Sequence, residues 1–165
     1  MNILASRTTR VVLVVVVQLG LVAAAVNGQL SARLTGDEYL FRVQPVDPID
    51  PFRGAYVDLH YPDLVSPDDD AMRALDRGEE GDVYLPLEKR GQFWEAAEPT
   101  RTRPSSGPYL TCSDDGWTVE CGIESWFLPQ DKALALEEAL QDGDVVARVK
   151  IDGRGNAALV AVEPR

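Results

Sequence analysis

The residue types that most often carry chemistry are few in this chain of 165 residues. It has one histidine, His60, and two cysteines, Cys112 and Cys121. An imidazole beside Asp58 can titrate near neutral pH, but a general base also needs a nucleophile or an activated water. Because the sequence identifies neither, His60 is predicted to be a surface or half-buried strand residue.

The two cysteines predict either a disulfide or two free thiols. An exported domain meets oxidising surroundings, which favour the bond. A two-residue turn at Asp115 and Gly116 would pair Cys112 with Val119, leaving the cysteines diagonal and about 7–8 Å apart. A bulge or a turn centred later would bring them together. The spacing does not match the C-x-x-C motif of redox enzymes.

Other polar clusters lack the spacing that a metal or a nucleophile requires. Acidic clusters at residues 68–70 and 79–82 do not have the alternating ligands of a calcium loop, and one His with two Cys is too few for a usual zinc site. Ser105 and Ser106 are not in a Gly-x-Ser-x-Gly elbow. No catalytic residue, metal or cofactor is predicted; an enzyme that uses carboxylates near residues 54–61 is kept as an alternative.

A proline-rich segment that leads into a strand is the best candidate for an interaction site. Its prolines, at residues 45, 48 and 51, favour an extended or turning backbone. Arg53 offers a planar fork for a carboxylate. In the alternative interpretation, Arg53 pairs with Asp47 or Asp50 and the aromatic rings fill the core. The candidate interaction residues are Asp50, Phe52, Arg53, Gly54, Tyr56 and Tyr61.

The same segment resembles the signature of the GDYXXLXY protein family, in which Gly-Asp-Tyr precedes two variable residues, Leu, one variable residue and Tyr. Residues 122–129 are similar to a second family element, Gly-Ile-Glu followed by aromatic, aliphatic and Pro residues, and residues 147–163 to its closing part. Ala55 stands at the family's Asp, so a charge-dependent role of that carboxylate is absent here. The residues that match the signature are Gly54, Tyr56, Leu59 and Tyr61.

The resemblance implies a location and a partner rather than a reaction. Members of the family are bacterial and membrane-associated, have no assigned biochemical activity, and are often encoded beside polytopic membrane proteins. A polytopic membrane protein is therefore the expected partner. Nucleic acid is not expected, because a chain with a net charge of −11 lacks the clustered Lys and Arg that phosphates require.

The elements that position these residues begin with an apolar N-terminal segment. Arg7 and Arg10 precede residues 11–26, which are almost entirely apolar, and all 27 acidic residues lie farther along the chain. This asymmetry keeps the arginines inside and the rest of the chain outside the cytoplasm. We expect residues 1–28 to be a membrane anchor or signal segment and residues 29–165 to be an extracytoplasmic β-rich domain.

Two interpretations of this segment are open. An uncleaved anchor needs about 17–25 apolar residues, which the segment reaches if it begins at Ala5 or Thr8. It would make the chain a single-pass protein of the bacterial plasma membrane and an accessory of its partner. A cleaved signal peptide would end at the small residues 23–25 and release a secreted binding protein.

The rest of the chain is predicted to be mostly β. Regular turns between alternating segments favour an antiparallel barrel-like or sandwich domain over βαβ units. Pro86 suggests that its strand lies at an edge. One or two short helices are expected, at residues 66–77 and 131–141. The expected strands are 38–44, 54–61, 82–89, 93–97, 108–113, 117–123, 144–151 and 157–162.

Overall fold

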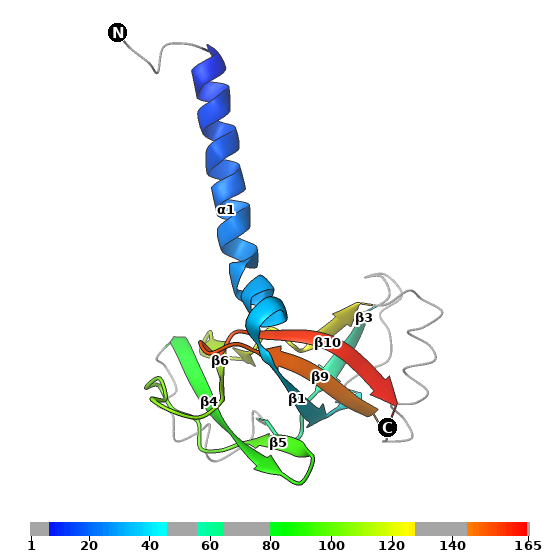
Figure 1. Cartoon of the computed structure of the whole chain (residues 1–165). Coiled ribbons are helices and arrows are strands. Elements are labelled where there is room, and N and C mark those ends of the chain that lie inside the picture. The colour runs from blue at the N-terminus through cyan, green and yellow to red at the C-terminus, as the bar shows by residue number, and fades with distance from the viewer. Residues whose placement is uncertain (1–6, 46–55, 65–79, 128–144, 165) are drawn as a thin grey trace.

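One long helix stands on a β domain in the computed structural model, which describes residues 7–45, 56–64, 80–127 and 145–164 (Figure 1). The helix, α1, comprises Arg7–Thr35, and the C-terminal end of the helix meets the domain. The expected mostly β, antiparallel fold on a single N-terminal apolar helix is confirmed. The positions expected for short helices, residues 66–77 and 131–141, lie outside the described residues.

The described strands form three small antiparallel sheets, with the orders β1-β9-β10, β2-β3-β8 and β5-β4-β6-β7. Their bounds are β1 Asp37–Arg42, β2 Gln44–Pro45, β3 Tyr56–His60, β4 Gly81–Arg90, β5 Phe93–Ala96, β6 Tyr109–Asp114, β7 Val119–Glu120, β8 Ser125–Phe127, β9 Val145–Ile151 and β10 Ala157–Pro164.

The described sheets curl into a half-barrel. β1 pairs with β9, and the Val43 amide still donates to the Val145 carbonyl at 3.4 Å before β2 pairs with β3. The same run of chain therefore joins the first two sheets. The Thr111 amide of β6 donates to the Gly155 carbonyl at 2.9 Å, which ties the third sheet to the turn between β9 and β10.

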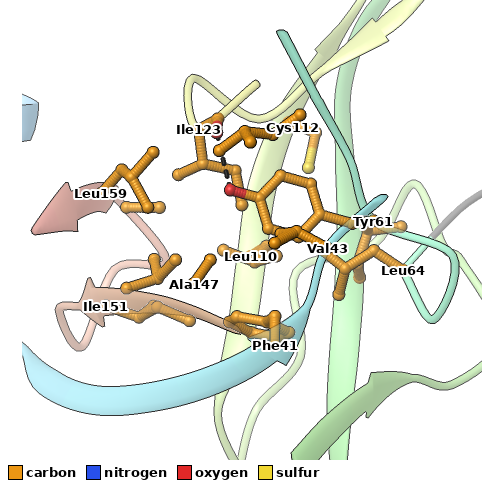
Figure 2. Packing of buried hydrophobic residues seen from close by; sticks show 14 of the residues in the cluster. Phe41, Val43, Tyr61, Leu64, Leu110, Cys112, Ile123, Ala147, Ile151 and Leu159 are labelled. Atoms are coloured by element: carbon orange, nitrogen blue, oxygen red, sulfur yellow. Dashed lines mark hydrogen bonds between the residues drawn. The ribbon is translucent and has the colours of Figure 1, made fainter. Parts of the chain in front are cut away.

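The core lies inside this curl, and the period-two pattern of the strands explains it. Every second residue of β9 is buried, and so are three alternate residues in the middle of β4. Residues at such positions point to one face of the sheet. Figure 2 shows how side chains from separate sheets meet there, among them Phe41, Leu110, Ile123 and Leu159.

Pro86 does not mark an edge strand, so that prediction was wrong. β4 is central, between β5 and β6. Pro86 lies where β4 stops pairing with β6 and begins to pair with β5. A proline lacks only the N–H donor, and the Pro86 carbonyl still accepts a hydrogen bond from the Ala97 amide at 2.8 Å. The change of pairing partner accommodates the missing donor.

Candidate functional site

The predicted interaction residues fall into three groups in the structure. Asp50, Phe52, Arg53 and Gly54 lie outside the described residues. Tyr56 begins β3, where its backbone pairs with Phe127 of β8.

Tyr61 is buried in the core at 6% exposure. Its hydroxyl donates to the Ile123 carbonyl at 2.8 Å, as Figure 2 shows. Burial, and to a lesser extent the charge of Glu124, raises the pKa of the Tyr61 phenol above its ordinary value. The phenol therefore stays neutral at physiological pH and is not available to a partner.

The two segments that resemble the family signature form one structural unit. β3 pairs with β8, and the Leu59 amide donates to the Glu124 carbonyl at 2.7 Å. The Ser125 hydroxyl also donates to the Asp58 carboxylate at 3.3 Å. The motif strand thus fixes the position of residues 122–127. The sequence did not predict β8, because three residues are too short for alternation to be visible.

The hairpin of β6 and β7 corrects the register expected for the cysteines. Asp114 pairs with Val119 instead of residue 117, so the loop contains four residues rather than two. The side chain of Asp115 closes this loop by accepting hydrogen bonds from the amides of Trp117 at 2.9 Å and Thr118 at 2.7 Å. An Asp that bonds its own downstream backbone stabilises such turns.

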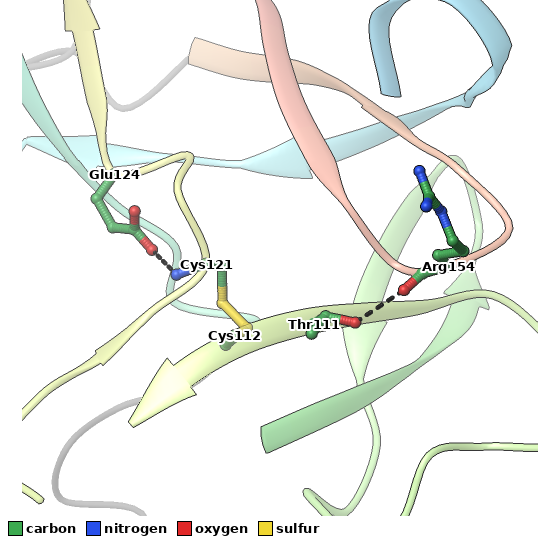
Figure 3. The surroundings of a disulfide bond; sticks show 5 residues. All are labelled: Thr111, Cys112, Cys121, Glu124 and Arg154. Atoms are coloured by element: carbon green, nitrogen blue, oxygen red, sulfur yellow. Dashed lines mark hydrogen bonds between the residues drawn. A yellow bond between two sulfur atoms is a disulfide. The ribbon is translucent and has the colours of Figure 1, made fainter. Parts of the chain in front are cut away.

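With this register the two cysteines face each other. Cys112 and Cys121 are joined by a disulfide, with their Cα atoms 4.1 Å apart. The bond ties β6 to the residues just before the 122–127 segment. The Glu124 carboxylate accepts a hydrogen bond from the Cys121 amide, which holds the same corner from its other side (Figure 3).

A cavity of about 470 Å³ lies at the foot of α1, between the helix and the domain. Its lining comes from Gln29 and Arg33 of α1, Leu159 of β10, Gly122 and residues 124–127. Gly122 has a φ of +78°, a conformation that favours glycine and turns the chain from β7 into β8. Phe127, at 76% exposure, is the most exposed aromatic residue of this lining. We call this region the helix-foot cavity.

Asp152 fixes the helix to the domain. Its Oδ2 accepts hydrogen bonds from the Ser31 hydroxyl of α1 at 2.5 Å and from the side-chain amide of Asn156. Its Oδ1 accepts hydrogen bonds from the backbone amides of Arg154 and Asn156, in the turn between β9 and β10. Burial alone would raise the pKa of Asp152, but the hydrogen bonds that it accepts, first from Asn156 and Ser31, lower it to about 2. The charged carboxylate is therefore an anchor between helix and turn.

β6 supports the same turn from the far side. The Thr111 hydroxyl donates to the Arg154 carbonyl at 3.0 Å, one residue before the disulfide at Cys112 (Figure 3). Gly155 has a φ of +80°, and a Cβ there would lie 2.6 Å from the Tyr109 ring. The turn thus needs glycine both for its backbone conformation and for the close approach of β6.

Small residues let α1 approach the sheet closely. Ala32 of α1 and Ala158 of β10 are both fully buried. A Cβ on Gly36 would lie 2.9 Å from the Ile151 backbone. The last turn of the helix therefore packs directly on β9 and β10, and it cannot swing without breaking these contacts.

Three basic side chains gather at this end of the helix, although the protein is acidic overall. Arg33 donates to the Leu159 carbonyl at 3.2 Å, Lys150 to the Arg33 carbonyl at 3.3 Å, and Arg154 to the Ser31 hydroxyl at 3.1 Å. Cations near a helix C-terminus are favourable because the free carbonyls there carry partial negative charge.

His60 lies half-buried beside a smaller cavity of about 160 Å³. Core side chains make up most of its lining, with Glu124 as a second polar group. Within the described ranges, no three His, Cys, Asp or Glu side chains come together as metal ligands.

The Asp152 carboxylate and its hydrogen-bond partners Ser31, Arg154 and Asn156 form a cluster that we call the Asp152 hub. Sequence reasoning identified residues 152–155 only as a turn. Nothing in the sequence indicated that Ser31, which is far away in the chain, would bind this turn.

Comparison with known proteins gave one match. A family model described as GDYXXLXY protein matches residues 18–162. Neither the curated proteins nor the solved structures contain a match. The match spans the second half of the apolar segment, the motif strand, the 122–127 segment and the strands that hold the helix.

Proposed function

The chain belongs to the GDYXXLXY protein family, and from that premise we propose that it is a membrane-anchored accessory protein without catalytic activity of its own. In this proposal residues 1–28 anchor the chain in the bacterial plasma membrane. Residues 29–165 form a domain outside the cytoplasm, beside a membrane-protein partner. The observation that carries the proposal is the exposed apolar surface of α1.

This apolar surface is too large to stay in water. α1 has 29 residues, hence a length of about 43 Å, which is enough to cross a bilayer. None of its most apolar 18-residue window is buried in the domain, and large apolar side chains from Val11 to Val26 are about half exposed or more. A core helix of a soluble domain would be covered. The bilayer supplies the cover that the domain does not.

A signal sequence near the N-terminus can also be long and apolar enough to pass for a membrane span, so the course of α1 beyond the apolar segment bears on the choice. The helix continues without a break through the small residues 23–25 and ends at Thr35. A peptidase would have to unwind it there to reach the backbone. The continuous helix supports an anchor that is retained.

The rim of the helix-foot cavity, at Phe127, supplies the surface that we propose faces the partner. Exposed aromatic side chains are enriched at interfaces, where their large area is buried on binding. Phe127 on β8 is an exposed aromatic side chain of this kind, and it shares the cavity lining with residues of the helix that we propose enters the membrane. A partner embedded in the same bilayer would meet this rim first.

Photo-crosslinking in native membranes tests the partner. A benzophenone amino acid replaces Phe127 in one variant and Trp117, which is 92% exposed but outside the cavity lining, in a control variant. At native expression, we expect the Phe127 variant to form a crosslinked adduct with an integral membrane protein. We expect no such adduct from the Trp117 variant. Recovery of this chain alone from both variants would contradict a partner at the rim.

A further inference from the structure

We propose that the helix-foot cavity binds the headgroup of a zwitterionic phospholipid, such as phosphatidylethanolamine, from the leaflet next to the domain. Such a headgroup carries a phosphate and, a few ångströms away, an ammonium group. The inference rests on the proposed membrane anchoring and adds a ligand for the cavity. Two observations support this inference: the position of the cavity relative to the bilayer and the chemistry of the side chains that line it.

The position of the cavity along α1 coincides with the headgroup layer of a bilayer that contains the helix. Residues 11–30 of α1 have a length of about 30 Å, the thickness of a bilayer's hydrocarbon core, and Leu30 is still half exposed. Gln29 then lies at the lower edge of the hydrocarbon, and Arg33 lies about 4.5 Å beyond Leu30. The headgroup layer on each side is roughly 5–8 Å thick. Arg33 therefore falls within this layer, and Gln29 lies at its boundary with the hydrocarbon.

Arg33 supplies the phosphate contact. One of its Nη atoms donates to the Leu159 carbonyl, which orients the guanidinium at the cavity wall. A guanidinium has five N–H donors in a planar fork that matches phosphate oxygens, so the contact with Leu159 leaves others to offer. Arg33 is also exposed, so a phosphate can reach it without rearrangement of the helix.

The wall formed by the β domain supplies the contact for the ammonium group. Glu124 is part of the cavity lining. One oxygen of its carboxylate accepts a hydrogen bond from the Cys121 amide, and a carboxylate has a second oxygen that can accept from an ammonium group. Trp126 is also part of the lining and packs partly against the core, and an aromatic ring of this kind attracts ammonium groups. The lining thus includes one basic side chain, Arg33, and one acidic side chain, Glu124, which is the pair of charges that a zwitterion requires.

Arg33 also stabilises the helix C-terminus, so the test must separate lipid binding from capping. Full-length protein in detergent is titrated with phosphatidylethanolamine or phosphatidylglycerol, and the bound lipid is counted by native mass spectrometry. Wild type is expected to prefer phosphatidylethanolamine. Arg33→Gln should weaken binding of both lipids about tenfold or more. Glu124→Gln keeps an acceptor for Cys121 and should remove only the preference.

Arg154→Gln is the matched control, because Arg154 lies at the same helix end but outside the cavity lining. It should bind both lipids as wild type does. The lipid proposal is overturned if wild type shows no preference, if Arg33→Gln and Arg154→Gln weaken binding equally, or if free phosphoethanolamine competes as well as the lipid does. Alkaline carbonate extraction of the same proteins reports on anchoring separately, so failure of the anchor is distinguishable from failure of the lipid site.

Discussion

At the scale of single residues, the structure depends on a few buried polar groups with complete sets of partners. Asp152 is a buried charged residue, and its carboxylate accepts hydrogen bonds from both the helix and its own turn. Tyr61 is a buried phenol that donates to a backbone carbonyl. A buried polar group is costly once it loses its partner, so these two positions should be the most sensitive to small changes.

Asp152→Asn should destabilise the domain and remove part of its pH dependence. The substitution replaces an acceptor oxygen by an N–H₂ group and removes charge-assisted hydrogen bonds, at a cost of about 2 kcal/mol in the free energy of unfolding. Because the folded pKa is about 2 and the ordinary value is 3.8, the wild-type contribution is complete above about pH 4. It is lost as the pH falls toward 2.

Urea unfolding monitored at pH 7 and across this acid range measures both effects. The exposed Asp82→Asn serves as the control and should leave the free energy of unfolding within about 0.5 kcal/mol of wild type. A variant at residue 152 that kept the wild-type loss of stability between pH 4 and pH 2 would contradict the role of this carboxylate.

Tyr61→Phe should cost about 1–3 kcal/mol of unfolding free energy. The ring still fills the core, but the buried Ile123 carbonyl loses its donor. Tyr84→Phe is the control, because its ring packs against Tyr109 and keeps this contact as Phe. Chemical denaturation compares the two variants, and equal stability of both would show that the hydrogen bond of Tyr61 contributes nothing.

At the scale of elements, backbone pairing and the disulfide hold three parts of the chain together: the motif strand β3, the 122–127 segment with β8, and β6. β3 orders β8 by backbone pairing, and the disulfide holds the preceding corner to β6. β6 in turn supports the β9–β10 turn that binds α1. The helix-foot cavity is therefore shaped by elements that lie far apart in the sequence.

Reduction of the disulfide should destabilise the domain by about 2–3 kcal/mol, because the bond closes a loop with a sequence separation of 9. Denaturation of wild type with and without dithiothreitol measures the effect. A variant with alanine at both Cys112 and Cys121 is the control, since its stability should not respond to the reductant. Wild type that unfolds at the same denaturant concentration in both conditions would contradict this role.

Gly36→Ala should loosen the junction between helix and domain. A Cβ at this position lies 2.9 Å from the Ile151 backbone and also meets the Ala32 carbonyl, so the helix end must move, at about 1–3 kcal/mol. Gly20→Ala introduces the same methyl group where nothing lies within 4 Å. Thermal unfolding in detergent should show a lower midpoint for Gly36→Ala alone; equal midpoints would mean that the junction is not tightly packed.

Period-two patterns predicted most strands, because alternation reports which face is buried. They did not predict β8 or the register of the β6–β7 hairpin, since a three-residue strand shows no period and the side chain of Asp115 decides the loop length. Nor did they predict the hub, because the pairing of Ser31 with Asp152 spans 121 positions. Of the candidate interaction residues, Tyr61 is a core residue, and an aromatic residue alone does not reveal which side of a strand is buried.

At the scale of the whole molecule, apolar and charged residues are separated along one axis. The apolar helix carries arginines at its N-terminal end, basic side chains surround its foot, and the net negative charge belongs to the chain beyond. Small buried residues and the Asp152 hub fix the helix to the domain, so the domain has one orientation relative to the helix. A membrane that holds α1 would therefore present the same face of the domain to every partner.

The mass of the chain recovered from fractionated cells tests the central claim, a retained anchor, most directly. Membranes are washed with alkaline carbonate, and intact-protein mass spectrometry is applied to the pellet and to the soluble fraction. We expect a chain in the pellet that still contains the whole of α1. A soluble chain that begins near Val26 would contradict this claim and would identify the segment as a cleaved signal peptide.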